Sequence, residues 1–344
     1  MSLPPVERFD TSTGVRIYRM SGDAFPTLVV HAYLLLGAGP PTLVDAGSGY
    51  GKCTEQLLEG LETVRTEFGE AVELKDIRRI IVTHGHIDHF GGVPALLDLP
   101  VWNDGPPQIA IHELDRHVLT AYEERVVVAT KGLRFFLEQA GVDDELLPAM
   151  MEMYGFSKKH VRSVPVDISL VDGQKLDGLE FIHTPGHCPG QVCIRLGDVL
   201  LSADHVLERT SPHQAPESIT AYTGLGHYLE ALEKVRRLDG IRLSLGGHEG
   251  PIHDLPSRVG SIKAGHLRKL DRVLDILRNA DSALTVAQIS QSMYPKVEGF
   301  HVLLALEETG AHVEYLYQRG QLSVDNLEEV EQQDRAKIRL KVKD

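Results

Sequence analysis

The chain of 344 residues is 42% hydrophobic and carries 35 basic and 49 acidic side chains, a net charge of −14. One or two globular domains are therefore expected, and the acidic balance argues against a broad surface for polyanions. The cysteines Cys53, Cys188 and Cys193 are too few for a disulfide framework, which predicts reduced thiols and a cytoplasmic location. Neither a signal peptide nor a membrane span is expected, because no basic N-terminal region precedes an apolar run and no such run approaches about 18 residues.

The first 255 residues alternate between strand and helix patterns. Residues 13–46 contain the alternating and continuous apolar runs typical of strands, and residues 50–67 carry leucines at helical spacing. Further strands are predicted within 77–84, 107–119, 164–171, 175–186, 191–204 and 241–250, and further helices within 91–99, 107–119, 120–160 and 224–238. This order predicts an α/β fold with sheets inside and helices outside.

From about residue 260 the pattern becomes helical. Residues 261–280 carry leucines three and four apart, Thr285 can cap the next helix, and residues 299–320 form a long helical pattern. Three helices followed by a short strand pattern are typical of a winged-helix unit. We predict one domain over residues 1–258 and a winged-helix-like domain with a terminal strand over 259–344, joined by a linker at 255–261.

Basic and apolar side chains alternate at the C-terminus, in residues 335–343. A period of two predicts a strand with one basic face. Such a face could bind an anion, but a sheet edge protected by lysines is favoured, and pairing with a second subunit makes a homodimer possible. From Ile262 onward the chain has 12 basic and 13 acidic side chains, so the C-terminal region as a whole is not basic.

The stretch HGHIDH places His84, His86, Asp88 and His89 within six residues, directly after an apolar strand pattern. Asp88 alone has a structural interpretation, as the cap of the helix predicted at 91–99. No such interpretation covers three histidines. Imidazole and carboxylate together suit zinc, iron or manganese. Because six residues cannot direct every ring to one tetrahedral ion, the pattern favours two neighbouring ions.

This stretch and four others resemble the five motifs of the metallo-β-lactamase fold superfamily. LVDAGSG contains Asp45, HTPGHCPGQ contains His187, LLSADHVL contains Asp204, and LGGHEGP contains His248. The five stretches occur in the family's order between residue 13 and about residue 255. The resemblance implies a four-layer αββα sandwich for this region.

The resemblance also implies a site for two divalent metal ions, with zinc favoured and iron or manganese as alternatives. One ion would be held by His84, His86 and His187, the other by Asp88, His89 and His248, with Asp204 bridging them. A water shared by the ions would attack the substrate. Asp88 would also accept a proton during the reaction, and Asp45 would orient a histidine ring.

Some residues near these motifs differ from the family pattern or lie beside it. Ala203 replaces the usual glycine before the bridging aspartate and requires compatible backbone angles. Cys188 occupies a position where Ser or Thr is common, and a packed thiol is expected there. Tyr222, Ser211 and His213 follow the bridging aspartate and are candidate substrate contacts, although an exposed surface loop explains them equally well.

Three classes of function fit these patterns. The first is a dinuclear hydrolase of a small ester, thioester or lactone, because the third motif resembles glyoxalase II-like and lactonase-like members. The second is an endoribonuclease for single-stranded RNA, because a winged-helix tail occurs in a group that contains such an enzyme; the acidic balance argues against it. The third is a non-enzymatic winged-helix binding protein, disfavoured because seven candidate ligands exceed the four of a closed zinc site. A small molecule is thus the expected partner, nucleic acid is a disfavoured alternative, and no membrane is expected.

Overall fold

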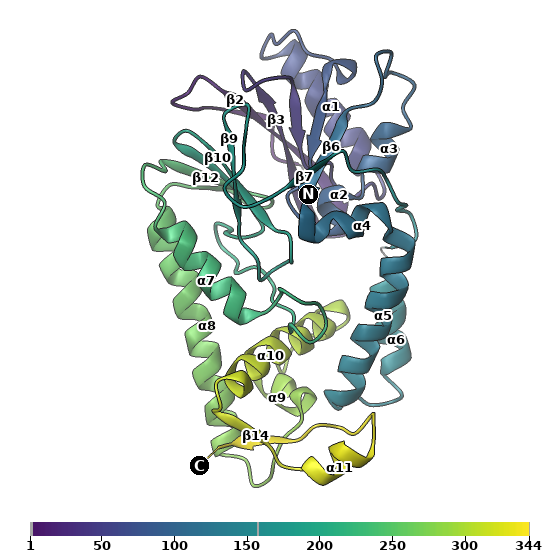
Figure 1. The fold of residues 1–344 in the computed structure, drawn as a ribbon, viewed down its shortest axis with the longest axis vertical. Coiled ribbons are helices and arrows are strands. Elements are labelled where there is room, and N and C mark those ends of the chain that lie inside the picture. Colours follow the sequence, from purple (N-terminus) through teal and green to yellow (C-terminus); the bar gives the residue numbers. More distant parts are fainter. Residues whose placement is uncertain (1–2, 157, 344) are drawn as a thin grey trace.

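The computed structural model describes residues 3–156 and 158–343, and two β-sheets lie in the upper half of the view in Figure 1. The first sheet contains β1 (Glu7–Asp10), β2 (Arg16–Phe25), β3 (Leu28–Leu36), β4 (Thr42–Val44), β5 (Arg79–Ile81), β6 (Gln108–His112) and β7 (Ile168–Leu170), in that spatial order. Strands β1 to β4 are antiparallel, and β4 to β7 are parallel. The parallel half therefore directs the ends of β4 and β5 to the same edge.

The second sheet has the spatial order β13-β12-β11-β10-β9-β8. Its strands are β8 (Lys175–Leu176), β9 (Leu179–His183), β10 (Val192–Leu196), β11 (Val199–Ala203), β12 (Leu243–Gly246) and β13 (Pro251–Ile252). Strands β11 and β12 are parallel, and their paired residues include Ala203 and Gly246. These two strands therefore end side by side.

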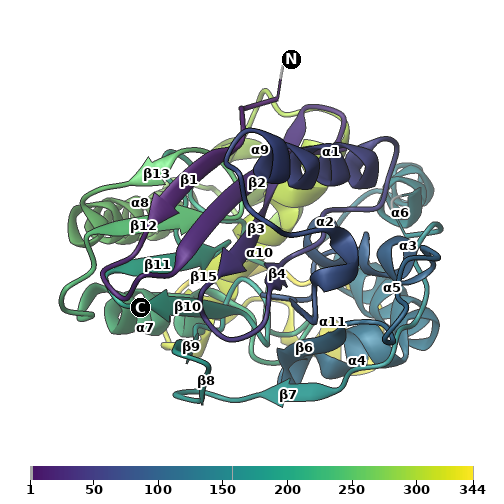
Figure 2. The ribbon, with the colours of Figure 1, turned by 90° about the horizontal axis from the view of Figure 1, so that it is seen from above.

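Helices cover the outer faces of both sheets (Figure 2). The first sheet is covered by α1 (Cys53–Thr66), α2 (Ile87–Phe90), α3 (Val93–Leu97) and α4 (Arg116–Thr120), and the second by α7 (Leu225–Arg236) and α8 (Leu255–Arg278). Helices α5 (Tyr122–Gln139) and α6 (Leu147–Phe156) follow α4 along one side of the molecule. The order of layers is helix, sheet, sheet, helix.

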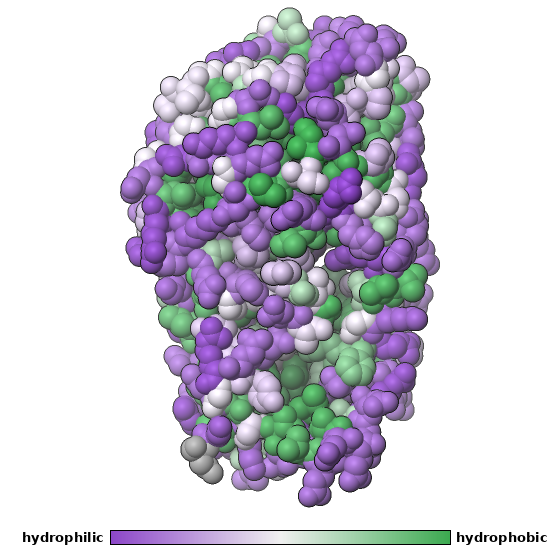
Figure 3. Space-filling model, viewed as in Figure 1, coloured by the Kyte–Doolittle hydropathy of each residue, from purple (hydrophilic) through white to green (hydrophobic). Residues whose placement is uncertain are grey.

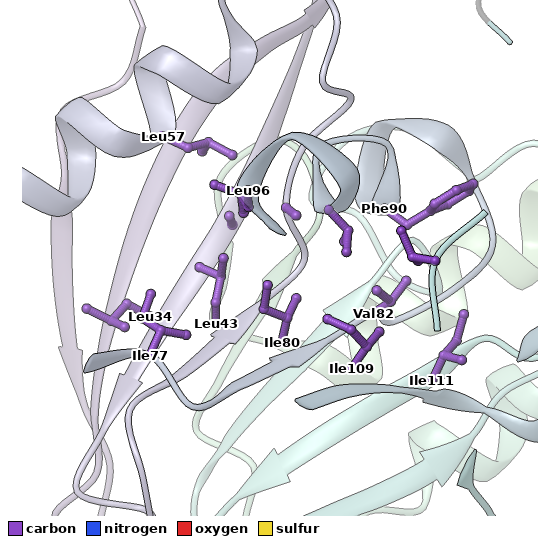
Figure 4. Packing of buried hydrophobic residues seen from close by; sticks show 14 of the residues in the cluster. Leu34, Leu43, Leu57, Ile77, Ile80, Val82, Phe90, Leu96, Ile109 and Ile111 are labelled. Atoms are coloured by element: carbon purple, nitrogen blue, oxygen red, sulfur yellow. The ribbon is translucent and has the colours of Figure 1, made fainter. Parts of the chain in front are cut away.

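The alternation of side chains along β2 and β3 builds two of the cores. Ile17 and Leu35 face the second sheet, whereas Tyr18 and Leu34 face the helices of the first. Figure 4 shows Leu34 with residues of β4 to β6, next to Leu57 of α1 and Leu96 of α3. The cores on both faces of the first sheet confirm the predicted four-layer αββα sandwich.

The C-terminal region is built on α8, which runs without a break from Leu255 to Arg278. The linker predicted at 255–261 is wrong, because these residues are the first turns of this helix. Proline is tolerated in a first turn, and the side chain of Asp254 caps the helix by accepting from Ser257 N. The division of the chain at residue 258 stays a prediction.

The remaining C-terminal elements are α9 (Val286–Met293), α10 (Phe300–Gln318), β14 (Leu322–Val324), α11 (Leu327–Gln332) and β15 (Leu340–Val342). Thr285 caps α9 in a capping box with Gln288, as predicted. The helices and the β14–β15 pair are the elements expected of a winged helix, whose detailed arrangement stays a prediction. Their core is continuous with that of α7 and α8.

The alternating C-terminal stretch is a strand only at Leu340–Val342. β15 pairs with β14 on one side and forms a bridge with Leu284 on the other, so both of its edges have partners within the chain. The strand therefore offers no support for the predicted homodimer, which stays untested. Three of the basic side chains in this stretch form ion pairs: Arg335 with Glu138, Arg339 with Glu329, and Lys341 with Asp325.

The surface is mostly hydrophilic on the face shown in Figure 3, with hydrophobic patches between the charged residues. In and beside α5 and α6, the exposed apolar side chains include Val127, Val128, Phe135 and Phe156. Within the described residues, no helix is both long and apolar enough to cross a membrane. Cys53, Cys188 and Cys193 are buried, and all three are free, in agreement with the predicted reduced thiols.

Candidate metal centre

The five sequence motifs meet because each follows the end of a strand. Asp45 follows β4, His84 follows β5, His187 follows β9, Asp204 follows β11, and His248 comes soon after β12. Ends of strands in layered α/β folds are the usual place for a site, because loops there converge from both sheets. The sandwich thus brings together residues more than two hundred positions apart in the chain.

The residues of the second motif are divided between an irregular segment and a short helix. His84 and His86 lie in the irregular segment after β5, whereas Asp88 and His89 lie in the short helix α2. The prediction that Asp88 caps the helix after it is wrong, because Asp88 already lies inside α2, whose N-cap is His86. The carboxylate of Asp88 instead approaches His248, with Oδ2 at 3.2 Å from the ring Nε2.

Two groups of side chains in this region could hold a metal ion. The first is His84, His86 and His187; the second is Asp88, His89, Asp204 and His248. Within each group the potential ligand atoms lie within 4.8 Å of one another. Asp204 lies between the groups, with carboxylate oxygens at 3.8 Å from His187 Nε2, 3.4 Å from His89 Nε2 and 3.3 Å from His248 Nε2. All seven predicted ligands are therefore brought together, and Asp204 is placed to serve both groups.

Four of the histidines share one mode of anchoring. Each Nδ1 lies within hydrogen-bond distance of an acceptor behind the site: Thr83 Oγ1 for His84 (3.1 Å), Asp45 Oδ2 for His89 (2.8 Å), the His213 carbonyl for His187 (2.7 Å) and the Val29 carbonyl for His248 (2.6 Å). These bonds fix the orientation of each ring and direct its Nε2 atom inward.

The inward atoms fit a metal site. The Nε2 atoms of His84, His89 and His187 and the Oδ1 atom of Asp204 are buried and have no hydrogen-bond partner. Buried polar atoms without partners are costly and rare in folded proteins. Their number here, and their common direction, are explained if divalent cations bind among them.

The two groups of side chains differ in electrostatics. Burial and the neighbouring histidines lower the pKa of His84 and His86, and burial lowers that of His187, so these rings are neutral and have free lone pairs at neutral pH. Burial also opposes protonation of His248, but Asp204 and Asp88 outweigh it and raise its pKa to about 10. A cation binding at the second group would therefore release a proton from His248.

Asp45 and Thr83 support the second motif from behind. Asp45 accepts hydrogen bonds from the Thr83 amide and hydroxyl, both at 2.8 Å, and from His89 Nδ1. Thr83 in turn contacts His84. The sequence predicted that Asp45 would orient a histidine ring, and the structure contains that contact. Thr83 had no signal in the sequence beyond its place before His84.

Asp115 is a supporting residue that the sequence did not reveal. Its buried carboxylate accepts from the amides of Gly85 (2.8 Å) and Gly190 (3.0 Å) and from the Cys188 thiol (3.3 Å). It thereby ties the second motif to the third. The contact also confirms that Cys188 is a packed thiol. The pattern PQIAIHELDRHVL predicted a strand followed by a helix and gave no sign of this role.

The backbone around the site contains several residues in the left-handed region. Asp45, Ala203 and Glu249 have φ of 62°, 45° and 65°, and each is a member or a direct neighbour of a motif residue. Such conformations cost of order 1–3 kcal/mol in residues other than glycine and cluster at functional sites. The compatible backbone angle expected of Ala203 is thus a left-handed one.

The three predicted substrate contacts differ in exposure and in their contacts. Tyr222 and Ser211 are exposed. His213 contacts a predicted ligand, because its carbonyl accepts from His187, although its ring faces Glu307. The role of these three residues in substrate binding stays a prediction.

Comparison with known proteins identifies the class. The sequence model described as the metallo-beta-lactamase superfamily matches residues 26–275, and the chain belongs to this superfamily. Among its relatives is a protein of Bacillus subtilis (strain 168) named probable metallo-hydrolase YqjP, 26% identical, with 80% of this chain and 84% of the relative covered. Another is the atrochrysone carboxyl ACP thioesterase nsrC of Aspergillus novofumigatus (strain IBT 16806), 24% identical, with 81% and 67% covered.

Solved structures match over nearly the whole chain. A metallo-beta-lactamase family protein from Thermus thermophilus has a TM-score of 0.71 and 27% identity, with 95% of this chain and 98% of that chain covered. A beta-lactamase domain protein from Burkholderia ambifaria has a TM-score of 0.74 and 22% identity, with 99% and 96% covered. The fold that they share therefore includes the C-terminal helical region.

Proposed function

We propose that the protein is a dinuclear metal-dependent hydrolase of small esters and thioesters. The observation that carries the proposal is the convergence of seven imidazole and carboxylate side chains, several of whose inward atoms are buried without a partner. His84, His86 and His187 would hold one ion, and Asp88, His89 and His248 the other, with Asp204 between them. This set exceeds the four ligands of a closed structural zinc site.

Divalent cations bound here would lower the pKa of a water molecule toward neutrality and polarise the oxygen of an ester or thioester carbonyl. Residues of the chain would accept the proton and orient a ligand. Asp88 has a lowered pKa, because the charges of His89 and His248 outweigh the opposing effect of burial, so its carboxylate is ionised and can accept a proton. Asp45 would hold the ring of His89 in one orientation.

The names of the relatives support the choice of substrate class. A protein named as a probable metallo-hydrolase and one named as an ACP thioesterase each align with about four fifths of this chain. A thioester carbonyl is a substrate that the proposed chemistry can attack directly. Lactones fit the same chemistry and belong to the set to be tested.

The contacts of the C-terminal stretch favour a small substrate over RNA. Arg335, Arg339 and Lys341 form ion pairs with carboxylates of the same chain. A polyanion-binding surface needs cations that can neutralise phosphates. These ion pairs, together with the acidic net charge, weigh against the endoribonuclease alternative.

The proposal is tested with a panel of acyl thioesters, aryl esters, lactones and single-stranded RNA, using zinc, manganese and iron forms of the protein. We expect metal-dependent turnover of a thioester or ester and none of RNA. His86→Ala should abolish that turnover, and His253→Ala, which changes an exposed histidine after the fifth motif, should retain it. Turnover of RNA alone, or full activity of His86→Ala, would contradict the proposal.

A further inference from the structure

Two adjacent glutamates of α10 are largely buried instead of exposed to solvent. The side chain of Glu308 is 10% exposed and that of Glu307 is 12% exposed. Both carboxylates contact the segment that follows Asp204, at residues 213 and 214. Buried carboxylates are costly unless they are paired, so their contacts identify what they stabilise.

The contacts form a short path from α10 to a predicted metal ligand. Glu308 Oε2 accepts from the backbone amide of Gln214 at 2.9 Å, and Glu307 Oε2 lies 3.0 Å from His213 Nε2. The carbonyl of His213 is the acceptor for His187 Nδ1, at 2.7 Å. This carbonyl belongs to the same peptide group as the Gln214 amide. One peptide therefore receives a hydrogen bond from His187 on one side and donates one to Glu308 on the other.

Glu308 is itself held in place by α8. Lys269 Nζ lies 2.6 Å from Glu308 Oε1, and His266 and His312 lie beside the same carboxylate. Glu308, His266 and His312 could by their spacing bind a metal ion. However, both carboxylate oxygens already have partners, and a lysine ammonium occupies the position of a cation. The contacts of this group match an anchor for Glu308 better than a third metal site.

We propose that Glu307 and Glu308 are positioning residues for His187, so that the C-terminal helical region completes the metal centre. The inference rests on the proposed function, because it assumes that His187 binds metal. Glu308 fixes the peptide between residues 213 and 214, and Glu307 fixes the ring of His213. The His213 carbonyl then has one position, which fixes the orientation of the His187 ring.

Hydrogen bonds that orient a ligating histidine affect the affinity for metal. Loss of a group that orients a ligating histidine typically lowers metal affinity or activity about 10- to 100-fold. Without the Glu308 carboxylate, the Gln214 amide loses its acceptor and the loop is no longer held at this point. His187 would then be free to turn, and the ion that it shares with His84 and His86 would bind less tightly.

Helix α10 also provides a matched control. Glu314 accepts from the backbone amides of Glu217 (2.6 Å) and Ser218 (3.0 Å), farther along the same loop. Glu314→Ala therefore removes the same kind of anchor from the same loop, but it leaves the peptide next to His187 untouched. Glu308→Gln keeps an oxygen that can accept from Gln214 and serves as the conservative variant.

The test measures zinc retention by the full chain during titration with a competing chelator. The wild type should hold two zinc ions per chain, and Glu308→Ala should lose one of them at about 10- to 100-fold lower chelator concentration. Glu307→Ala should change in the same direction. Glu314→Ala and Glu308→Gln should resemble the wild type. Thermal melts of the metal-free variants show whether each is folded, and Glu307→Ala carries the test if Glu308→Ala is not.

The outcomes separate this inference from the proposed function. Two tightly held ions in the wild type together with unchanged retention in folded Glu308→Ala and Glu307→Ala would overturn the inference and leave the proposed function standing. Equal losses in the Glu314→Ala control would also overturn it, because a general loosening of the loop would then be the cause. A wild type that holds fewer than two ions would overturn both.

Discussion

Gly247 is the residue whose side-chain size is most tightly limited by the candidate site. A Cβ atom at this position would lie 2.5 Å from Asp204 Oδ1 and 2.5 Å from His89 Cε1. Both neighbours are predicted ligands, and neither can withdraw without leaving the centre. A glycine between β12 and His248 is thus required by close packing, whatever the backbone conformation.

We therefore expect Gly247→Ala to lose metal binding and activity. The added methyl group must displace Asp204 or His89, since contacts this short do not occur in folded proteins. Gly260→Ala in α8 is the control, because a Cβ there meets no atom within 4 Å, and alanine in a helix stabilises by roughly 0.5–1 kcal/mol. Metal content and thermal unfolding of both variants check the prediction. Unchanged metal content in Gly247→Ala would refute the described geometry.

Asp115 leads to a second prediction for a single residue. Asp115→Ala leaves the buried amides of Gly85 and Gly190 without acceptors, and each such group costs about 1–3 kcal/mol. We expect a loss of at least about 2 kcal/mol in the free energy of unfolding, together with weaker metal binding. Asp104→Ala, which removes an exposed ion pair with Arg78, should cost about 0–1 kcal/mol. Urea unfolding of the metal-free proteins distinguishes the two, and equal losses would contradict the role given to Asp115.

Among the elements, α8 joins the sandwich to the C-terminal helices. Its buried residues include Val259 and Ile262 in the core of the second sheet and Leu270 and Val273 nearer to α9 and α10. The sequence predicted most of this helix but placed a linker over its start, where the side chain of Asp254 caps the helix. The exact start of a helix depends on such local hydrogen bonds, which composition does not reveal.

The contact between α8 and α10 has a predicted dependence on pH. Burial would raise the pKa of Glu308, but Lys269 and the neighbouring His312, His213 and His266 outweigh it and lower the pKa from 4.5 to about 2. A carboxyl group whose pKa is lowered by folding stabilises the folded state at a pH above its pKa in the unfolded chain. This contribution is lost as the pH falls from about 4.5 toward 2.

The measurement compares the wild type with Glu308→Ala, both without metal. Their difference in unfolding free energy, obtained with urea, should be largest near about pH 7 and should shrink steadily below about pH 4.5. In this difference, the contributions of the groups that titrate in both proteins cancel. A difference that stays constant over this range would show that the Glu308 charge does not stabilise the contact.

At the scale of the whole molecule, the sequence predicted the layers, the candidate ligands and one supporting residue, Asp45, but not the other supports. His84, His187 and His248 stand in short motifs that follow apolar strands, so both their chemistry and their place could be inferred. Asp115, Glu307 and Glu308 stand in ordinary helical patterns, far from any motif. Their role depends on tertiary contacts with the loops at residues 85, 190 and 214. Local patterns carry no information about such contacts.

The two sheets are joined by hydrogen bonds beside the candidate metal centre. His31 of β3 donates its amide to the Gly247 carbonyl at 2.8 Å, and the Val29 carbonyl accepts from His248. These contacts join the first sheet to the fifth motif on the second. A metal bound between the sheets would stabilise the folded state by mass action, so a chelator should lower the melting temperature of the loaded protein.

The central claim is that the seven side chains form a dinuclear centre, and metal content tests it most directly. Protein loaded with zinc and then freed of loosely bound ions should contain two zinc ions per chain by elemental analysis. His187→Ala should reduce this content toward one, because the second group, with Asp204, remains complete. A wild type that holds one ion or none after loading would contradict the account.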